Sequence, residues 1–256
     1  MFLEKFRMDG QIAVVTGGGR GIGLACAEAL AEAGSRVTII DRDPAVAESG
    51  RQALSSKGIE VDALVLDVTD SAAVDKAAAD IFAKHGRIDA LVANAGIART
   101  GTAAEETSDE LWLNVNDVNY NGVFWCNRAF GRYMLKAGRG SIVNIGSMSG
   151  YIVNRPQLQT YYNASKAAVH HLTASLAAEW ASRGVRVNAV APTYIETEMT
   201  RTAVDSSWTD VWIRDTPMGR LGQPHEIASV VHFLACDASS LITGATVKAD
   251  AGFTCW

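Results

Sequence analysis

Features that would place this chain in a special class are scarce. Its four cysteines and five histidines form no CxxC or HExxH pattern, so the sequence offers no metal cage. No apolar run is long enough to span a membrane, and the start, MFLEKFRMDG, lacks the apolar core of a signal peptide. The net charge of −5 gives no basic field for nucleic acid or an anionic membrane. We therefore expect a cytoplasmic protein with free thiols and no metal.

The composition is that of an ordinary α/β protein, with 48% hydrophobic residues, 20% charged residues and 23 glycines. Apolar runs rich in Val, Ile and Ala alternate with segments of helical pattern. Because these runs do not alternate with polar residues, they indicate parallel strands that are covered on both faces. Strands are expected at 12–17, 36–41, 61–68, 88–96, 141–147, 185–192 and 245–250. Helices are expected at 21–34, 44–57, 71–85, about 110–137 and about 160–182.

This order predicts a Rossmann-type, doubly wound parallel sheet of about seven strands with helices on both faces. No linker or low-complexity tract divides the chain, so we expect one domain over 1–256, with a cofactor half (about 1–150) and a catalytic and substrate half (about 140–256). The two longest helices, 110–137 and 160–182, have more apolar positions than one buried face needs. That excess favours contact with a partner subunit.

The segment TGGGRGIG (16–23) lies between the first strand and the first helix. Gly17 permits a tight turn, Gly21 lets the backbone approach a pyrophosphate, and Gly23 allows close packing of helix and strand. The helix N-terminus offers free N–H groups to phosphates. Asp41 ends the second strand, where an acid can accept hydrogen bonds from a ribose 2′-hydroxyl. The sequence therefore predicts a dinucleotide site.

The choice between NAD and NADP depends on the charges at this corner. A 2′-phosphate beside Asp41 would meet like charge, which favours NAD. Arg20 and Arg42 are nearby cations that could neutralise such a phosphate, so NADP stays open.

Further motifs extend over nearly the whole chain: NAG (94–96), YxxxK (162–166), Asp67-Val68, VNYNG (118–122), GVRVNAVAP (184–192) and the C-terminal GRLGQPHEIA…TGATVKADAG. With TGxxxGxG, their order and spacing resemble the short-chain dehydrogenase/reductases. The resemblance implies a homotetrameric oxidoreductase. It also implies that Asp67 and Val68 line the adenine pocket, that Asn94, Ala95 and Gly96 line the ribose side, and that Thr197 meets the nicotinamide. The cofactor set implied in the same way includes Ile22, Pro192, Ile195, Tyr162 and Lys166.

Tyr162 and Lys166 are four residues apart and share a helix face, whereas Tyr161 is five residues from Lys166 and does not. A free tyrosine is a poor base at neutral pH, and a nearby ammonium favours its phenolate. We therefore expect Tyr162 to be the base, with its pKa lowered by Lys166. Tyr161 is expected to pack or to form a pocket wall.

Ser147 and Ser149 compete for the role of holding the reacting oxygen. Ser147 directly follows the strand end, as in the family, but lies 15 residues before Tyr162, whereas Ser149 restores the usual family spacing of 13. We prefer Ser147 and expect Ser149 in the substrate pocket. By the same resemblance, Asn119 is the fourth catalytic residue, which shapes a helix for a proton relay from the lysine.

The substrate pocket is expected from 148–161, a lid at 193–217, the region after Asn94 and the C-terminus. The first segment supplies polar side chains: Ser149, Asn154, Arg155, Gln157 and Gln159. The lid supplies a more apolar wall: Tyr194, Met199, Trp208 and Trp212. Two positions depart from the family pattern, Thr193 in place of the usual glycine after Pro192, and Ala251 in the usual DGG.

Stretches such as GSMSG, IVNRPQ and DTPMGRLGQP are similar to galactitol-dehydrogenase-type enzymes within the family. They imply NAD-dependent oxidation of a polyol, a diol or another secondary alcohol. Ser149 and Asn154 are expected to bind a second substrate hydroxyl. An NADPH-dependent 3-ketoacyl reductase is the alternative enzyme, and a non-catalytic dinucleotide sensor is an alternative of another class.

Overall fold

The computed structural model describes residues 1–198, 200 and 206–255. Within that part of the chain, seven strands form one parallel sheet in the order β3-β2-β1-β4-β5-β6-β7. They are β1 (Ile12–Thr16), β2 (Arg36–Asp41), β3 (Asp62–Val65), β4 (Ala90–Ala93), β5 (Gly140–Ile145), β6 (Val185–Pro192) and β7 (Thr246–Ala249). The strand order reverses between β1 and β4, which is where doubly wound sheets bind ligands. The predicted fold class is confirmed.

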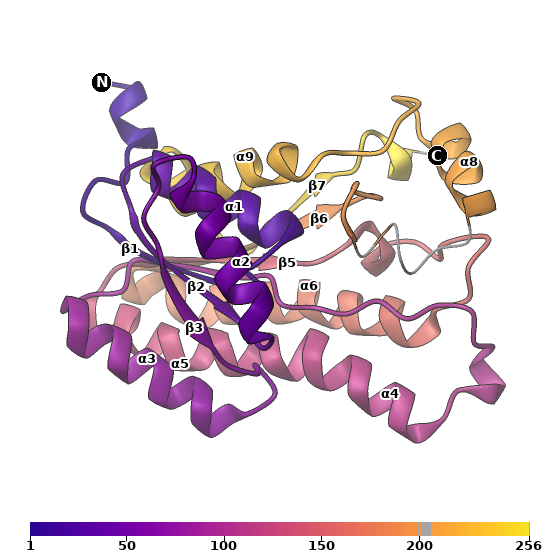
Figure 1. Cartoon of the computed structure of the whole chain (residues 1–256), viewed down its shortest axis with the longest axis horizontal. Helices are drawn as coiled ribbons and strands as arrows, with labels where there is room; N and C mark the ends of the chain where they lie inside the picture. Colours follow the sequence, from indigo (N-terminus) through magenta and orange to yellow (C-terminus); the bar gives the residue numbers. More distant parts are fainter. Residues whose placement is uncertain (199, 201–205, 256) are drawn as a thin grey trace.

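Helices cover both faces of the sheet, as Figure 1 shows. On one face lie α1 (Gly21–Glu32), α2 (Pro44–Ser55) and α9 (Pro224–Ala235); on the other lie α3 (Ser71–His85), α5 (Gly122–Ala137) and α6 (Thr160–Trp180). Each face has its own buried cluster. One includes Val15 and Leu30, and the other includes Leu91 and Phe130. Because β1 and β4 are buried along their whole length, their sequences show no alternation.

The helix expected at 110–137 is divided in the structure. It consists of α4 (Asp109–Asn116), a π-helical turn (Asp117–Asn121) and α5. The π-turn inserts an extra residue into the helical ladder, a distortion that is frequent at functional sites. It carries Asn119, whose side chain bonds a loop after β4 rather than the helix itself.

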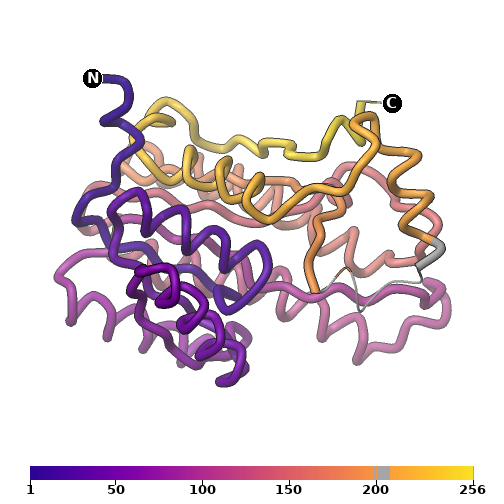
Figure 2. Tube along the Cα trace, turned by 45° about the horizontal axis from the view of Figure 1, so that its top comes forward, coloured from indigo at the N-terminus to yellow at the C-terminus, as the bar shows by residue number. Residues whose placement is uncertain are grey.

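The strand ends point toward one end of the long axis, where α4 and α8 (Ser206–Asp215) lie (Figures 1 and 2). Both views place the C-terminus at that end and the N-terminus at the opposite end. None of the described helices is long and apolar enough to cross a membrane. Among the described residues there is also no cluster of three potential metal ligands. The four cysteines are free, and burial raises the pKa of the Cys26 and Cys126 thiols to about 12.

Candidate active site

Two adjoining cavities lie beyond the carboxyl ends of the central strands. They measure about 920 and 950 Å³ including their open mouths, and they share part of their lining: Ile22, Asn94, Gly96, Ile97 and Thr197. We call the first the catalytic cavity, because Tyr162 and Lys166 line it, and the second the nucleotide cavity, because the glycine-rich turn lines it. Their common boundary makes them one continuous cleft, large enough for two ligands placed end to end.

The nucleotide cavity begins at a tightly packed corner of the sheet. Gly17 has a φ of 60°, and a Cβ at Gly23 would lie 2.1 Å from the Gly17 carbonyl oxygen. The Asn94 amide donates to the carbonyl oxygens of Thr16 and Gly17, both at 2.9 Å, and so ties β4 to the turn. Gly23 itself does not line either cavity. Its contribution is the close packing of α1 on the turn, as the sequence predicts.

The structure brings the other predicted cofactor residues together. The nucleotide cavity is lined by Gly17, Arg20, Gly21, Ile22, Asp41, Arg42, Asp67, Val68, Asn94, Ala95, Gly96 and Thr197. Pro192, Ile195, Tyr162 and Lys166 line the adjoining catalytic cavity. A Cβ at Gly21 would come within 3.4 Å of the Thr197 methyl group, so the cradle at the start of α1 is narrow. Free N–H groups at that helix N-terminus suit a pyrophosphate, and the residues therefore fit a dinucleotide.

The part of the nucleotide cavity that bears on NAD or NADP binding is lined by Asp41, Arg20, Arg42 and Glu198. Asp41 accepts long hydrogen bonds from the N–H groups of Gly19 (3.4 Å) and Asp43 (3.3 Å), which hold its carboxylate at the end of β2. Arg20 lines the cavity and forms an ion pair with Glu198, with 2.7 Å between Nη1 and Oε2. Arg42 lines the same cavity. The ion pair partly neutralises Arg20, so Asp41 and Arg42 are left as opposing influences.

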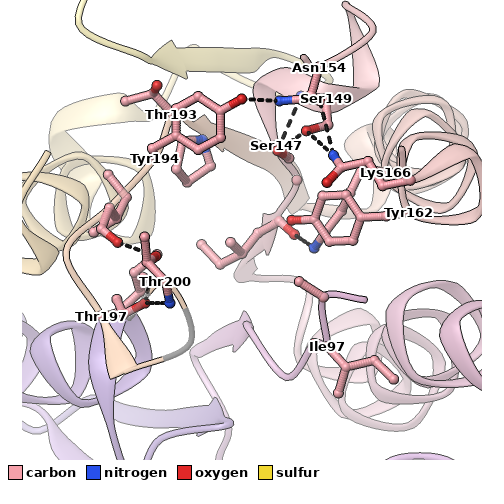
Figure 3. Close-up of a pocket in the computed structure, with 18 of the residues that line it drawn as sticks. Ile97, Ser147, Ser149, Asn154, Tyr162, Lys166, Thr193, Tyr194, Thr197 and Thr200 are labelled. Carbon is pink, nitrogen blue, oxygen red and sulfur yellow. Dashed lines mark hydrogen bonds between the residues drawn. The ribbon is translucent and has the colours of Figure 1, made fainter. Parts of the chain in front are cut away.

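Tyr162 and Lys166 occupy the first turns of α6 and line the catalytic cavity together (Figure 3). The Lys166 Nζ lies 5.7 Å from the centroid of the Tyr162 ring and donates a 2.8 Å hydrogen bond to the carbonyl oxygen of Ile145. The shared helix face is therefore confirmed. Tyr161 lies in the core, fully buried and outside the cavity lining, as a packing residue.

The sequence predicts that Lys166 lowers the pKa of Tyr162. In the structure, the side chains and backbone of the protein alone shift that pKa in the opposite direction. Burial raises the pKa of the Tyr162 phenol, and a hydrogen bond with Ser147 only partly opposes that rise. Burial also lowers the pKa of the Lys166 ammonium to about 8. Both shifts favour the uncharged form, because the cavity desolvates both groups.

Ser147 and Ser149 both line the catalytic cavity, and their hydroxyl oxygens are 3.0 Å apart. A 3-10 turn (Met148–Gly150) brings them together, and the Ser149 N–H donates to the Ser147 Oγ at 3.1 Å. Of the two, Ser147 is the one that contacts Tyr162, since its hydroxyl acts on the Tyr162 pKa. The contact agrees with the preference for Ser147, and the turn explains why spacing alone could not separate the two serines.

His170 packs against this turn and supports it. This role of His170 was not predicted from the sequence. The Ser147 N–H is directed at the His170 Nε2 at 3.4 Å, and a Cβ at Gly146 or Gly150 would come within 2.4 Å of the ring. Burial, followed by the charge of Lys166, lowers the His170 pKa to about 4, so the ring is neutral and can accept this bond. The signal was available, because His170 is four residues after Lys166 and shares its helix face.

Asn119 lies behind the catalytic cavity rather than in its lining. Its Oδ1 accepts from the Ile97 N–H at 2.8 Å, and its Nδ2 donates to the Ile97 carbonyl at 2.9 Å and to the Ser165 hydroxyl at 3.2 Å. A Cβ on Gly96 would lie 3.3 Å from Asn119 Oδ1 and 3.7 Å from Lys166 Nζ. Asn119 thus joins the π-turn, the loop after β4 and α6, next to the lysine.

The predicted substrate wall is assembled from distant segments. The residues predicted for the substrate that line the catalytic cavity are Ser149, Asn154, Gln157, Gln159, Tyr194 and Trp212, joined after Asn94 by Ala98 and Thr100. Arg155 is exposed and outside this lining, and Trp208 packs near Trp212 with ring centroids 6.4 Å apart. Met199 lies outside the described residues. The C-terminal segment contributes Phe253, whose ring meets that of Tyr194 edge-on.

Comparisons with known proteins agree with this geometry. Residues 17–254 match the family model described as Enoyl-(Acyl carrier protein) reductase. The chain is 58% identical to galactitol 2-dehydrogenase of Rhizobium johnstonii, over 100% of this chain and 99% of the relative. It is 51% identical to galactitol 2-dehydrogenase (L-tagatose-forming) of Cereibacter sphaeroides, over 98% of each chain. The crystal structure of gox2181 matches with a TM-score of 0.97 and 54% identity, over 100% of both chains.

Proposed function

Because the chain belongs to the short-chain dehydrogenase/reductase family and interconverts a secondary alcohol and its ketone, we propose that it is an NAD-dependent polyol dehydrogenase. The observation that carries the proposal is the continuous cleft, in which Ser147, Tyr162 and Lys166 adjoin the cavity of the glycine-rich turn. Fold alone does not specify a reaction, but this set of side chains supplies proton transfer beside a dinucleotide site.

When bound, NAD supplies the hydride acceptor, and the chain supplies position and proton traffic. The Tyr162 oxygen takes the proton of the substrate hydroxyl, and the Ser147 hydroxyl donates a hydrogen bond to the reacting oxygen. Lys166, with a pKa of about 8, can exchange a proton at neutral pH and serves the relay next to Asn119. Because burial raises the Tyr162 pKa, oxidation is favoured at alkaline pH, where more of the phenol is ionised, and ketone reduction at lower pH.

The position of Asp41 supports NAD as the preferred cofactor. Its carboxylate lines the nucleotide cavity at the end of β2, where it can accept hydrogen bonds from a ribose hydroxyl and would repel a 2′-phosphate. The ion pair of Arg20 with Glu198 weakens one of the two cations that could offset that repulsion. Arg42 favours the alternative, an NADPH-dependent reductase of the 3-ketoacyl type.

A polyol is supported by the polar wall and by the two relatives, which are galactitol 2-dehydrogenases. Ser149 and Asn154 line the catalytic cavity, where we place a second hydroxyl of the substrate near them. We further propose that the protein is a homotetramer and that it is located in the cytoplasm. Trp112 and Leu113 on α4, exposed by 43% and 56%, provide apolar surface for a subunit contact.

One screen tests the function. The purified protein is incubated with galactitol, other polyols, diols and simple secondary alcohols, with NAD and with NADP, and reduced cofactor is followed by absorbance. We expect the highest kcat/KM with NAD and a polyol. A strong preference for NADP with a 3-ketoacyl thioester in the reductive direction would establish the alternative, and turnover of no alcohol or ketone would favour a sensor.

A further inference from the structure

One wall of the catalytic cavity is a chain of hydrogen-bonded side chains, which we call the amide wall: Asn154, Gln157, Gln159, Tyr194 and Trp212. All of them line the cavity. The Tyr194 hydroxyl oxygen is at its centre, 2.9 Å from Asn154 Nδ2 and 3.0 Å from Gln157 Nε2. The bond to Asn154 is visible in Figure 3, on the same side of the cavity as Ser147 and Ser149.

The direction of the bond from Gln157 follows from a donor that cannot be reversed. An indole N–H only donates, and the Trp212 Nε1 lies 3.2 Å from Gln157 Oε1. The carboxamide of Gln157 must therefore turn its NH₂ group to Tyr194. On the other side, the Asn154 Nδ2 donates to Tyr194, and the Asn154 Oδ1 accepts from the Gln159 Nε2 at 3.1 Å.

Two donors therefore occupy the acceptor positions of the Tyr194 oxygen, and its own proton is left over. Among the described residues, no side chain or carbonyl accepts that proton. Burial raises the pKa of Tyr194, so the group stays a neutral O–H donor through the physiological range. Tyr194 is part-buried and lines the cavity, so a hydroxyl group bound in the cavity can supply the acceptor.

The ring of Tyr194 is also held in place, so its hydroxyl cannot easily turn away. It stacks on Trp212 with ring centroids 3.8 Å apart and an interplanar angle of 6°, and Phe253 packs edge-on against it at 5.6 Å. A donor fixed on both sides needs little reorganisation when a ligand binds.

We propose that the Tyr194 hydroxyl donates a hydrogen bond to a hydroxyl group of the substrate other than the one that is oxidised, and thereby selects polyols over monohydric alcohols. The inference rests on the proposed polyol dehydrogenase function and deepens it. Asn154 and Gln157 each donate one NH₂ hydrogen to the Tyr194 oxygen, so the hydroxyl hydrogen of Tyr194 is left to bond the substrate.

The test compares wild type with Tyr194→Phe, which keeps the ring stack and removes only the hydroxyl. The measured quantity is the ratio of kcat/KM for galactitol to kcat/KM for 2-hexanol, each with the cofactor that the wild type prefers. We expect the ratio to fall about three- to tenfold, mainly through the KM for galactitol, as the loss of one neutral hydrogen bond predicts. Tyr133→Phe, which removes a hydroxyl from a ring stacked on Phe82 and outside the lining of both cavities, should leave the ratio unchanged.

A second variant keeps Tyr194 itself. Trp212→Phe retains an aromatic partner for the stack but removes the indole N–H, so Gln157 can turn its carboxamide and accept the proton of Tyr194. The ratio should then fall although the tyrosine is intact. If Tyr194→Phe shows no cooperative melting transition, Trp212→Phe still tests the role of the Tyr194 hydroxyl.

The possible results distinguish the role of Tyr194 from the proposed polyol dehydrogenase function. An unchanged ratio in a folded Tyr194→Phe variant, or an equal loss with both alcohols, overturns the role of Tyr194 and leaves the polyol dehydrogenase standing. If the wild type oxidises no polyol with either cofactor, the proposed function and the role of Tyr194 are both overturned.

Discussion

Replacement of Lys166 by methionine is expected to abolish turnover and to relieve an electrostatic cost of folding. Lys166 is 4% exposed, and burial lowers the pKa of its ammonium from 10.5 to about 8. A depressed lysine pKa means that the folded chain holds the charge less favourably than the unfolded chain does. A buried lysine that carries this cost in the cleft is best explained by its part in the reaction.

The size and sign of the effect follow from linkage. The difference between the two pKa values corresponds to about 3 kcal/mol, at 1.36 kcal/mol per pKa unit. Below pH 8 both states bind the proton, and the wild type carries the whole cost. Between about pH 8 and 10.5 the unfolded state binds more protons than the folded state, so the free energy of unfolding rises with pH, and above that range the cost is gone. Methionine carries no such cost, although it leaves the Ile145 carbonyl without its donor.

Urea unfolding of wild type and Lys166→Met at pH 7, 8 and 9 checks this. The difference in unfolding free energy, variant minus wild type, should decrease by about 1 kcal/mol from pH 7 to pH 9. The buried thiols of Cys26 and Cys126 titrate in both proteins and cancel in the difference. Lys136→Met, on an exposed position of α5, should give a difference that does not vary with pH. A constant difference for Lys166→Met would refute the reasoning.

Three further outcomes are expected. Tyr162→Phe should lower kcat by about 10²- to 10⁴-fold while NAD binding, measured by fluorescence titration, is retained; turnover near the wild-type rate would exclude Tyr162 as the base. Asp41→Ala should raise kcat/KM with NADP relative to NAD, and an unchanged ratio would show that the carboxylate does not face the ribose. Ala251→Gly should raise the urea-unfolding free energy by about 1 kcal/mol, because Ala251 has a φ of 52°, where a Cβ is strained; a loss of stability would contradict this.

The fold and the proton-transfer pair were accessible from sequence because both depend on short-range patterns. The uninterrupted apolar runs of β1 and β4 identify strands covered on both faces, whatever lies above them. Tyr162 and Lys166 are four residues apart on one helix, so their proximity follows from helix geometry alone. The glycines of the first turn were identified in the same way, because they follow the end of an apolar strand and have a fixed spacing.

The features that sequence reasoning missed depend on contacts between distant segments. The family resemblance indicated that Asn119 shapes a helix, but the π-turn itself is fixed by the bonds of the Asn119 amide to Ile97. The pKa of Tyr162 depends on how much solvent the cavity excludes, and the presence of a lysine four residues later does not report that. Ala251 occupies a left-handed position that the family usually gives to glycine, and only the backbone angle shows the strain.

Selectivity in this cleft depends on which polar atoms are left over rather than on how many are present. In the amide wall, Gln157 forms hydrogen bonds with Trp212 and Tyr194. Asn154 forms them with Gln159 and Tyr194, so many donors and acceptors of the wall are paired with one another. Such bonds make the wall rigid but give a substrate little to bind. The remaining donor on Tyr194 therefore has a large effect on selectivity, since a second substrate hydroxyl can accept its proton and an alcohol without one cannot. A site built to bond a substrate hydroxyl rejects the analogue that lacks it for the same reason.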